Sequence, residues 1–162
     1  MLKLAGIILV SAAISFAGFH KALKIKDGIR TRRALLEFVL YVKRNIEASS
    51  SELSEIYKSY HDEALQKTGF LQILTSQDGN TLEYALKDSA LQLPDSLSEI
   101  YLNLSRTLGK SRSAKTETEN LARYICAIEA EEAKLIKNDE TKLMLYRKLG
   151  LLSGILAALI LI

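Results

Sequence analysis

The sequence is poor in the residues that mark disulfide scaffolds, zinc sites and β-folds. Among its 162 residues Cys126 is the only cysteine, so no disulfide can form within the chain and a Cys-based zinc site is excluded. Tryptophan is absent, Pro94 is the only proline, and no long Val/Ile/Thr alternation predicts a strand. The abundance of Leu, Ala, Glu and Lys instead favours helix throughout, and the length suits one domain.

The charge balance also excludes some functions. The chain carries 22 Lys and Arg against 19 Asp and Glu, a net charge of +3. No basic stripe is interleaved with aromatic residues, so we predict no nucleic-acid partner. The apolar residues are unevenly distributed, because both ends are apolar and the middle is charged.

The middle of the sequence carries apolar residues at helical spacing. A first stripe, within residues 29–47, consists of Leu35, Leu36, Val39, Leu40, Val42 and Ile46. Arg32, Arg33, Lys43 and Arg44 fall mostly off this stripe. A second helix is predicted from a serine cap near Ser51 to a stop at Gly69, since glycine tolerates the left-handed end of a helix.

The rest of the middle also reads as helix separated by turns. Residues 76–80 predict a turn, 81–90 a short helix, and Pro94 a break before a helix that ends at residues 108–110. From Ser113 to Ile162 one continuous helix of 50 residues is predicted, roughly 75 Å long at ~1.5 Å per residue. The predicted fold is all-α, an antiparallel helical bundle of five to six helices with a long C-terminal helix, membrane-anchored at both ends.

Two uncharged runs predict the membrane anchors. Residues 4–19 form a run of 16 and residues 149–162 a run of 14, whereas a spanning helix needs about 20 residues. Lys3 and His20-Lys21 lengthen the first run, because their polar ends can extend to the interface. Leu143, Met144 and Tyr146 lengthen the second run, with Arg147 and Lys148 near the interface. We therefore predict an N-terminal transmembrane helix (1–22), a cytoplasmic helical bundle domain (23–142) and a C-terminal transmembrane or membrane-anchoring helix (143–162).

Other interpretations of these ends stay open. The N-terminal run also resembles a cleaved signal peptide, with a small-x-small site at residues 15–17. The C-terminal run is alternatively a buried core helix. Of the 22 Lys and Arg, 21 lie between His20 and Lys148, so the positive-inside rule predicts a cytoplasmic middle and outward-facing termini.

Few residues suggest a site. Glu129, Glu131 and Glu132, with Glu117 and Glu119 upstream, predict either a solvated helix face or a docking surface for a basic partner. His20 and His61 are expected on the surface, and Cys126 as a small buried hydrophobe. No nucleophile elbow or phosphate loop is present, so we predict no catalytic, cofactor or metal site and no small-molecule substrate. An enzyme with an unrecognised site stays a distant alternative.

The C-terminal run contains a small-residue pattern. Gly150 and Gly154 are four residues apart, a spacing that lets two helices approach closely. The partner helix is either the N-terminal run or a second copy of the chain, which allows a homo-oligomer. Small residues are also common in such segments without any partner.

The two ends of the sequence resemble the stage III sporulation protein AB family. The resemblance rests on the start, Met1-Leu2-Lys3-Leu4-Ala5-Gly6 with Gly18-Phe19, and on the end, Lys148-Leu149-Gly150-Leu151-Leu152-Ser153-Gly154-Ile155. Between them the pairs Leu108-Gly109 and Leu121-Ala122 and the acidic run from Glu129 to Ala133 occur in matching order.

This resemblance implies a function. The family belongs to endospore-forming bacteria and forms part of a channel between mother cell and forespore. Its soluble domain is similar to the cytoplasmic domain of the inner-membrane platform protein of type II secretion and type IV pilus systems. The resemblance thus implies a non-enzymatic platform in the mother-cell membrane that docks the ATPase, stage III sporulation protein AA, and other channel components. A platform subunit of another secretion or pilus machine is the alternative.

Overall fold

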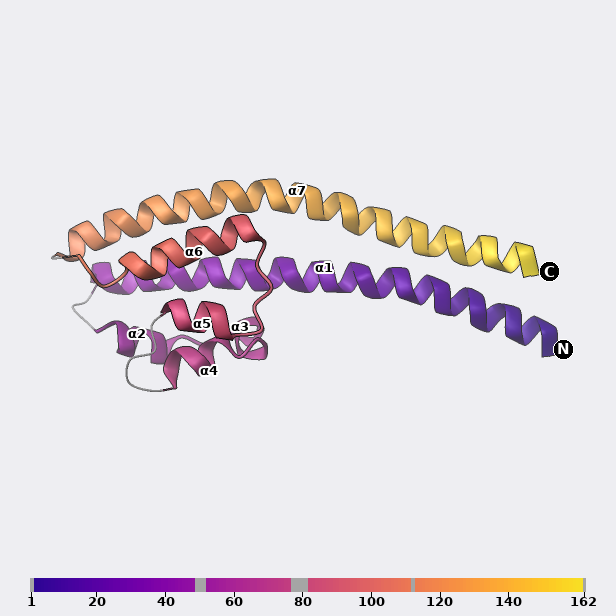
Figure 1. The fold of residues 1–162 in the computed structure, drawn as a ribbon, viewed down its shortest axis with the longest axis horizontal. Helices are drawn as coiled ribbons and strands as arrows, with labels where there is room; N and C mark the ends of the chain where they lie inside the picture. Colours follow the sequence, from indigo (N-terminus) through magenta and orange to yellow (C-terminus); the bar gives the residue numbers. More distant parts are fainter. Residues whose placement is uncertain (1, 49–51, 77–81, 112, 162) are drawn as a thin grey trace. The chain divides into compact units, whose positions relative to one another are not determined.

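The computed structural model describes residues 2–48, 52–76, 82–111 and 113–161, and the regular elements in these ranges are all α-helices (Figure 1). In chain order they are α1 (Leu2–Ala48), α2 (Leu53–Ser59), α3 (Glu63–Lys67), α4 (Phe70–Thr75), α5 (Leu82–Asp88), α6 (Asp95–Thr107) and α7 (Ala114–Leu161). The all-α prediction is confirmed. The single long helix predicted from Ser113 to the C-terminus matches α7.

The chain divides into two compact units, and both α1 and α7 contribute to each of them. We call Arg30–Lys134 the bundle unit. We call Met1–Ile29 together with Leu135–Ile162 the hairpin unit. These boundaries differ by several residues from the predicted domain boundaries at 22/23 and 142/143.

The core of the bundle unit is centred on Phe38 of α1, whose side chain is fully buried. Its ring contacts three aromatic rings from the short helices, at centroid distances of 5.7 Å to Tyr57, 5.2 Å to Tyr60 and 5.6 Å to Phe70. Tilted and edge-on pairs of this kind add about 0.5–1.5 kcal/mol each beyond area burial. The short helices α2 and α4 are therefore held against α1 by one aromatic cluster, and Figure 1 shows where these helices lie.

The predicted helix from Ser51 to Gly69 is wrong, because two helices occupy this stretch. The backbone is extended at Tyr60, with φ −86° and ψ 132°, which ends α2. Asp62 then caps α3, as its Oδ1 accepts a hydrogen bond from the Leu65 amide at 3.0 Å. Gly69 does stop a helix as predicted, with φ 76° in the left-handed region. The predicted cap at Ser51 lies outside the described residues.

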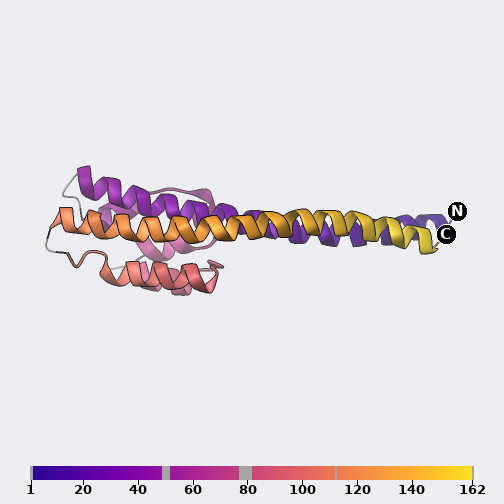
Figure 2. The same cartoon turned by 90° about the horizontal axis from the view of Figure 1, so that it is seen from above.

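Helix α6 begins and ends where the proline and glycine of the sequence predict. Pro94 stands directly before α6, and Gly109 adopts φ 78° directly after Leu108. The helix α5 begins and ends close to the predicted range, while residues 77–80 of the predicted turn lie outside the described residues. Helix α6 lies beside the first part of α7 (Figures 1 and 2). Both therefore belong to the bundle unit.

The hairpin unit consists of the N-terminal part of α1 and the C-terminal part of α7, which run antiparallel side by side (Figure 2). Many large apolar side chains of this unit are solvent-exposed, among them Phe16 (71%), Leu151 (62%) and Leu159 (66%). Among the residues that the structure describes, no helix is long and apolar enough to cross a membrane, which does not match the spanning helices predicted for 1–22 and 143–162.

Candidate interaction sites

The acidic residues predicted as one surface have different environments. Glu132 is buried, with 5% of the residue exposed, and its carboxylate accepts two hydrogen bonds from Arg32 Nε, at 2.9 Å and 3.1 Å. Arg32 is buried to a similar extent (6%). The prediction that Glu132 faces a partner is therefore corrected, because its charge is used inside the bundle unit to join α1 to α7.

Arg32 is the residue that the sequence analysis missed. The predicted stripe leaves it mostly off the apolar face, yet Arg32 precedes Leu35 by three residues and Val39 by seven, which is the spacing of the buried face. A cation on an otherwise apolar face is a signal that a buried anion lies opposite. Nothing in the sequence, however, indicates which of the chain's carboxylates it is.

Tyr101 on α6 completes the surroundings of this ion pair. Its hydroxyl is buried and has no hydrogen-bond partner among the described residues. Burial raises the pKa of Tyr101 above its ordinary value, and the negative charge of Glu132 raises it further. The phenol therefore stays neutral at physiological pH beside a charged pair.

Glu117 also has a structural role that its position in an acidic run did not indicate. Its Oε1 accepts a hydrogen bond from the Gly109 amide at 2.7 Å, and its Oε2 accepts one from the Ser111 amide at 3.1 Å. Only 6% of the residue is exposed. Glu117 thus fixes the left-handed turn at Gly109 and with it the connection from α6 to α7.

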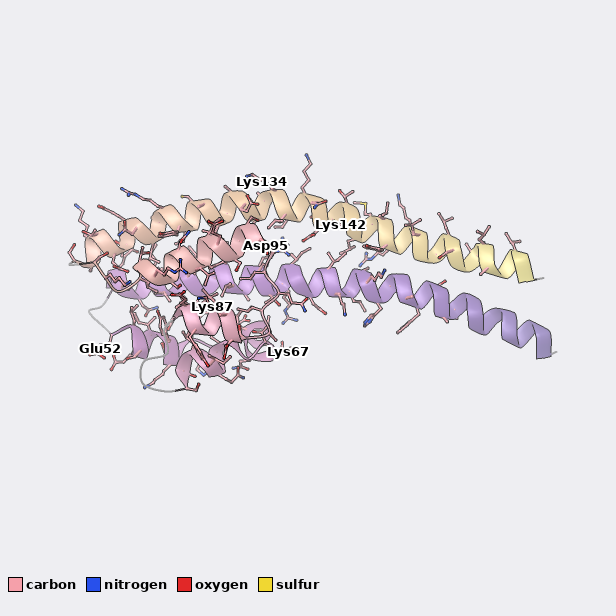
Figure 3. All side chains as sticks on the ribbon, viewed as in Figure 1. Glu52, Lys67, Lys87, Asp95, Lys134 and Lys142 are labelled. Carbon is pink, nitrogen blue, oxygen red and sulfur yellow. The ribbon has the colours of Figure 1, made fainter. Side chains whose placement is uncertain are left out.

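Of the five acidic residues predicted as one surface, Glu119, Glu129 and Glu131 lie at the surface of α7, and Glu131 is half-buried. Glu131 pairs with Lys134 at 3.0 Å, and Lys134, labelled in Figure 3, projects from α7 into solvent. Hydrogen bonds from Lys134 and then Ser96 hold the pKa of Glu131 below its usual value. Glu129 is exposed, so the predicted acidic surface is reduced to Glu129 and Glu131, with Glu119 about three turns upstream.

In the hairpin unit, the small-residue pattern contacts the N-terminal helix. Gly18 of α1 and Gly150 of α7 meet so closely that a Cβ on Gly18 would lie 2.7 Å from the Gly150 Cα. A Cβ on Gly150 would lie 3.2 Å from the carbonyl oxygen of Ser15. Of the partners left open by the sequence, the structure brings the N-terminal helix to Gly150. Gly154 is buried as well.

Two cation–π contacts lie next to this glycine contact, both on the side nearer Ile29 and Leu135. The Lys21 ammonium of α1 lies 5.5 Å from the ring centroid of Tyr146 on α7. In the opposite sense, the Arg147 guanidinium of α7 lies 5.8 Å from the ring of Phe19 on α1. Each contact is worth about 0.5–1 kcal/mol at an exposed site. Together with the glycines they hold α1 and α7 in one register.

The two histidines and the cysteine do not form a site with one another among the described residues. His20 and His61 are exposed, and the His61 Nδ1 lies 3.1 Å from the Ser59 carbonyl oxygen. Cys126 is exposed, so the prediction that it is buried is wrong. Among the described residues no group of three or more His, Cys, Asp and Glu is arranged to hold a metal ion.

A surface hollow of about 240 Å³ in the bundle unit contains one carboxylate, Glu83. That carboxylate already pairs with Lys87 at 2.7 Å and with Arg106 at 3.2 Å. These contacts hold the pKa of Glu83 below its usual value, with the hydrogen bond from Lys87 as the largest cause. Such a group is a surface ion pair and not a candidate general base.

The described contacts define an all-α protein that consists of a small helical bundle and a glycine-packed helical hairpin with exposed apolar side chains. The chain belongs to the stage III sporulation protein AB family, whose profile matches residues 3–162 and confirms the resemblance noted in the sequence. Membership implies a role in sporulation, and the family is not known as one of enzymes. No curated protein and no solved structure matches the chain.

Proposed function

We propose that this protein is a non-enzymatic platform component of the channel between mother cell and forespore, attached to the mother-cell membrane and docking a cytoplasmic secretion-type ATPase. The proposal rests on membership of the sporulation family. The observation that supports attachment is the set of large apolar side chains that the hairpin unit exposes, since such a patch on a soluble monomer is unusual and typical of a membrane or protein contact.

The docking part of the proposal places the ATPase on the acidic surface of the bundle unit. Glu129 is exposed, and Glu131 is negatively charged at neutral pH, as a glutamate with an ordinary or lowered pKa is. The bundle unit as a whole carries 14 Lys and Arg and 16 Asp and Glu, a net charge of −2. A basic face of the partner would approach such a unit faster than a neutral one.

The test measures binding of the purified stage III sporulation protein AA to the full chain in detergent. The double variant Glu129→Lys, Glu131→Lys should associate about tenfold more slowly than the wild type, because reversed charge repels a basic partner. The matched control is Glu52→Lys, Glu99→Lys, which makes the same change in net charge at two exposed positions. Glu52 lies directly before α2 (Figure 3), and Glu99 lies on α6.

Three outcomes of this test are distinguishable. Slower association of the Glu129→Lys, Glu131→Lys variant, with an unchanged rate for the control variant, supports docking on α7. If both variants associate like the wild type, the acidic surface is not the docking site. If the wild type does not bind the ATPase at all, the docking role itself falls.

A further inference from the structure

The hairpin unit concentrates positive charge in the chain. It contains eight Lys and Arg against three Asp and Glu, a net charge of +5, whereas the bundle unit is net negative. Six of these cations are exposed and lie on one side of the glycine contact, the side nearer Ile29 and Leu135. They form the group that we call the basic collar: Lys21, Lys24, Lys26, Lys142, Arg147 and Lys148.

Antiparallel pairing brings the two halves of the basic collar to the same level of the hairpin. The contact between Lys21 and Tyr146 fixes the register of the two helices. From this level Lys26 lies about 8 Å further along α1, and Lys142 about 6 Å further along α7 in the same direction, at ~1.5 Å per residue. Figure 3 marks this region with the label of Lys142. Residues more than a hundred positions apart in sequence thus form one charged band.

On the other side of this band, toward the two termini, Ser153 is exposed and the large exposed side chains are apolar. They are Phe16, Phe19, Leu149, Leu151, Leu152, Ile155, Leu156 and Leu159, each more than half exposed. From the termini toward the bundle-side end of the hairpin unit, an apolar segment is therefore followed by the basic collar. A bilayer with anionic lipids has the matching order of hydrocarbon followed by negative headgroups.

We propose that the basic collar binds anionic phospholipid headgroups, so that the hairpin unit selects bilayers rich in such lipids over neutral ones. This rests on the proposed attachment of the hairpin unit to a membrane and names the lipid class that it recognises. The two cations held over aromatic rings, Lys21 and Arg147, fix the register of the helices. The collar lysines 24, 26, 142 and 148 supply the remaining charge.

The test is flotation of the purified full chain, diluted from detergent, with vesicles of phosphatidylcholine alone or of phosphatidylcholine mixed with phosphatidylglycerol. The wild type should bind the mixed vesicles more tightly at about 0.01 M salt and lose the preference at about 1 M, where the Debye length falls to ~3 Å. Each collar lysine near the surface contributes about fivefold in affinity.

Three variants locate the effect. In the first, lysines 24, 26, 142 and 148 become glutamine, and binding to mixed vesicles should fall about 100-fold or more while binding to phosphatidylcholine stays unchanged. In the second, the same lysines become arginine, and binding should be retained. In the third, Lys58, Lys110, Lys115 and Arg123 of the bundle unit become glutamine, which makes the same change in net charge at exposed positions and should leave lipid preference unchanged.

Each contrary outcome has its own meaning. Equal binding to both kinds of vesicle overturns the selectivity but leaves membrane attachment in place. Equal losses in the first and third variants overturn the role of the basic collar, since net charge alone would then act. Failure to float with any vesicle overturns both proposals. Circular dichroism of each variant confirms that its helical content is that of the wild type.

Discussion

Among single residues, Arg32 and Glu132 of the buried ion pair are those whose substitution should lower the stability of the bundle unit most. Arg32 and Glu132 are desolvated together, and removing one leaves the other charged in a site with little access to water. The neighbouring Glu129, three residues earlier on α7, is exposed. Two carboxylates less than one turn apart therefore differ sharply in their expected contribution to stability.

The substitution Glu132→Gln should lower the free energy of unfolding of the bundle unit by about 3–5 kcal/mol, because it leaves Arg32 uncompensated. The control Glu129→Gln should change it by no more than about 0.5 kcal/mol. Urea unfolding of the full chain, followed by circular dichroism, measures both. Equal stabilities of the two variants would contradict the structural role of the pair.

Tyr101 should behave in the opposite way. Its buried hydroxyl has no hydrogen-bond partner in the part of the chain that the structure describes, so Tyr101→Phe should stabilise the bundle unit by about 1 kcal/mol at neutral pH. Since the pKa of Tyr101 is raised in the folded state, its neutral form favours folding below about pH 10 and stability falls as the pH rises above that value. The variant should lose less stability there. Destabilisation by this change would show that the hydroxyl has a partner.

At the scale of helices, the register of α1 against α7 in the hairpin unit depends on the absence of two Cβ atoms. Gly18→Ala places a Cβ 2.7 Å from the Gly150 Cα and 2.9 Å from the Tyr146 carbonyl oxygen. Both are backbone atoms and cannot move aside as a side chain would. The helices should therefore separate, at a cost of about 1–3 kcal/mol. Gly6→Ala is the matched control, because nothing lies within 4 Å of its new Cβ.

Cross-linking measures this separation directly. Cysteines at Lys21 and Tyr146, in a Cys126→Ser background, report the contact beside the glycines. A short bismaleimide should join them rapidly in this background and in the Gly6→Ala variant, and more slowly with Gly18→Ala. Equal rates in all three would mean that the glycine contact does not set the distance between the helices.

At the scale of the whole molecule, the orientation in the cell can be read from the native cysteine. Cys126 is the only cysteine and is exposed on α7 in the bundle unit. If the bundle unit is cytoplasmic, a maleimide that cannot cross membranes should label Cys126 only after protoplasts are permeabilised. The variant Cys126→Ser gives the background signal. Labelling of intact protoplasts would place the bundle unit outside and remove it from reach of the ATPase.

Local sequence signals predicted the helices well and their interruptions in part. Gly69, Pro94 and Gly109 mark helix ends in the sequence and in the structure, because each restricts or frees the backbone without help from distant residues. The break at Tyr60 carried no such signal. The Tyr60 hydroxyl donates a hydrogen bond to the Ala34 carbonyl oxygen of α1, and the Tyr60 ring packs on Phe38. This packing against α1 ends the helix where the local pattern would continue it. Burial in these contacts also raises the pKa of Tyr60 to about 12.

The sequence alone determined that the protein is helical, that its long last helix is uninterrupted, and that it resembles its family, since composition, periodicity and end motifs are local properties. Only the tertiary structure decided which acidic residues are surface and which are core, because Arg32 and Glu132 are 100 positions apart. It likewise decided that Gly150 contacts Gly18 and that two distant groups of lysines form one collar. Pairing between distant segments depends on how the helices pack, and one-dimensional spacing does not encode it.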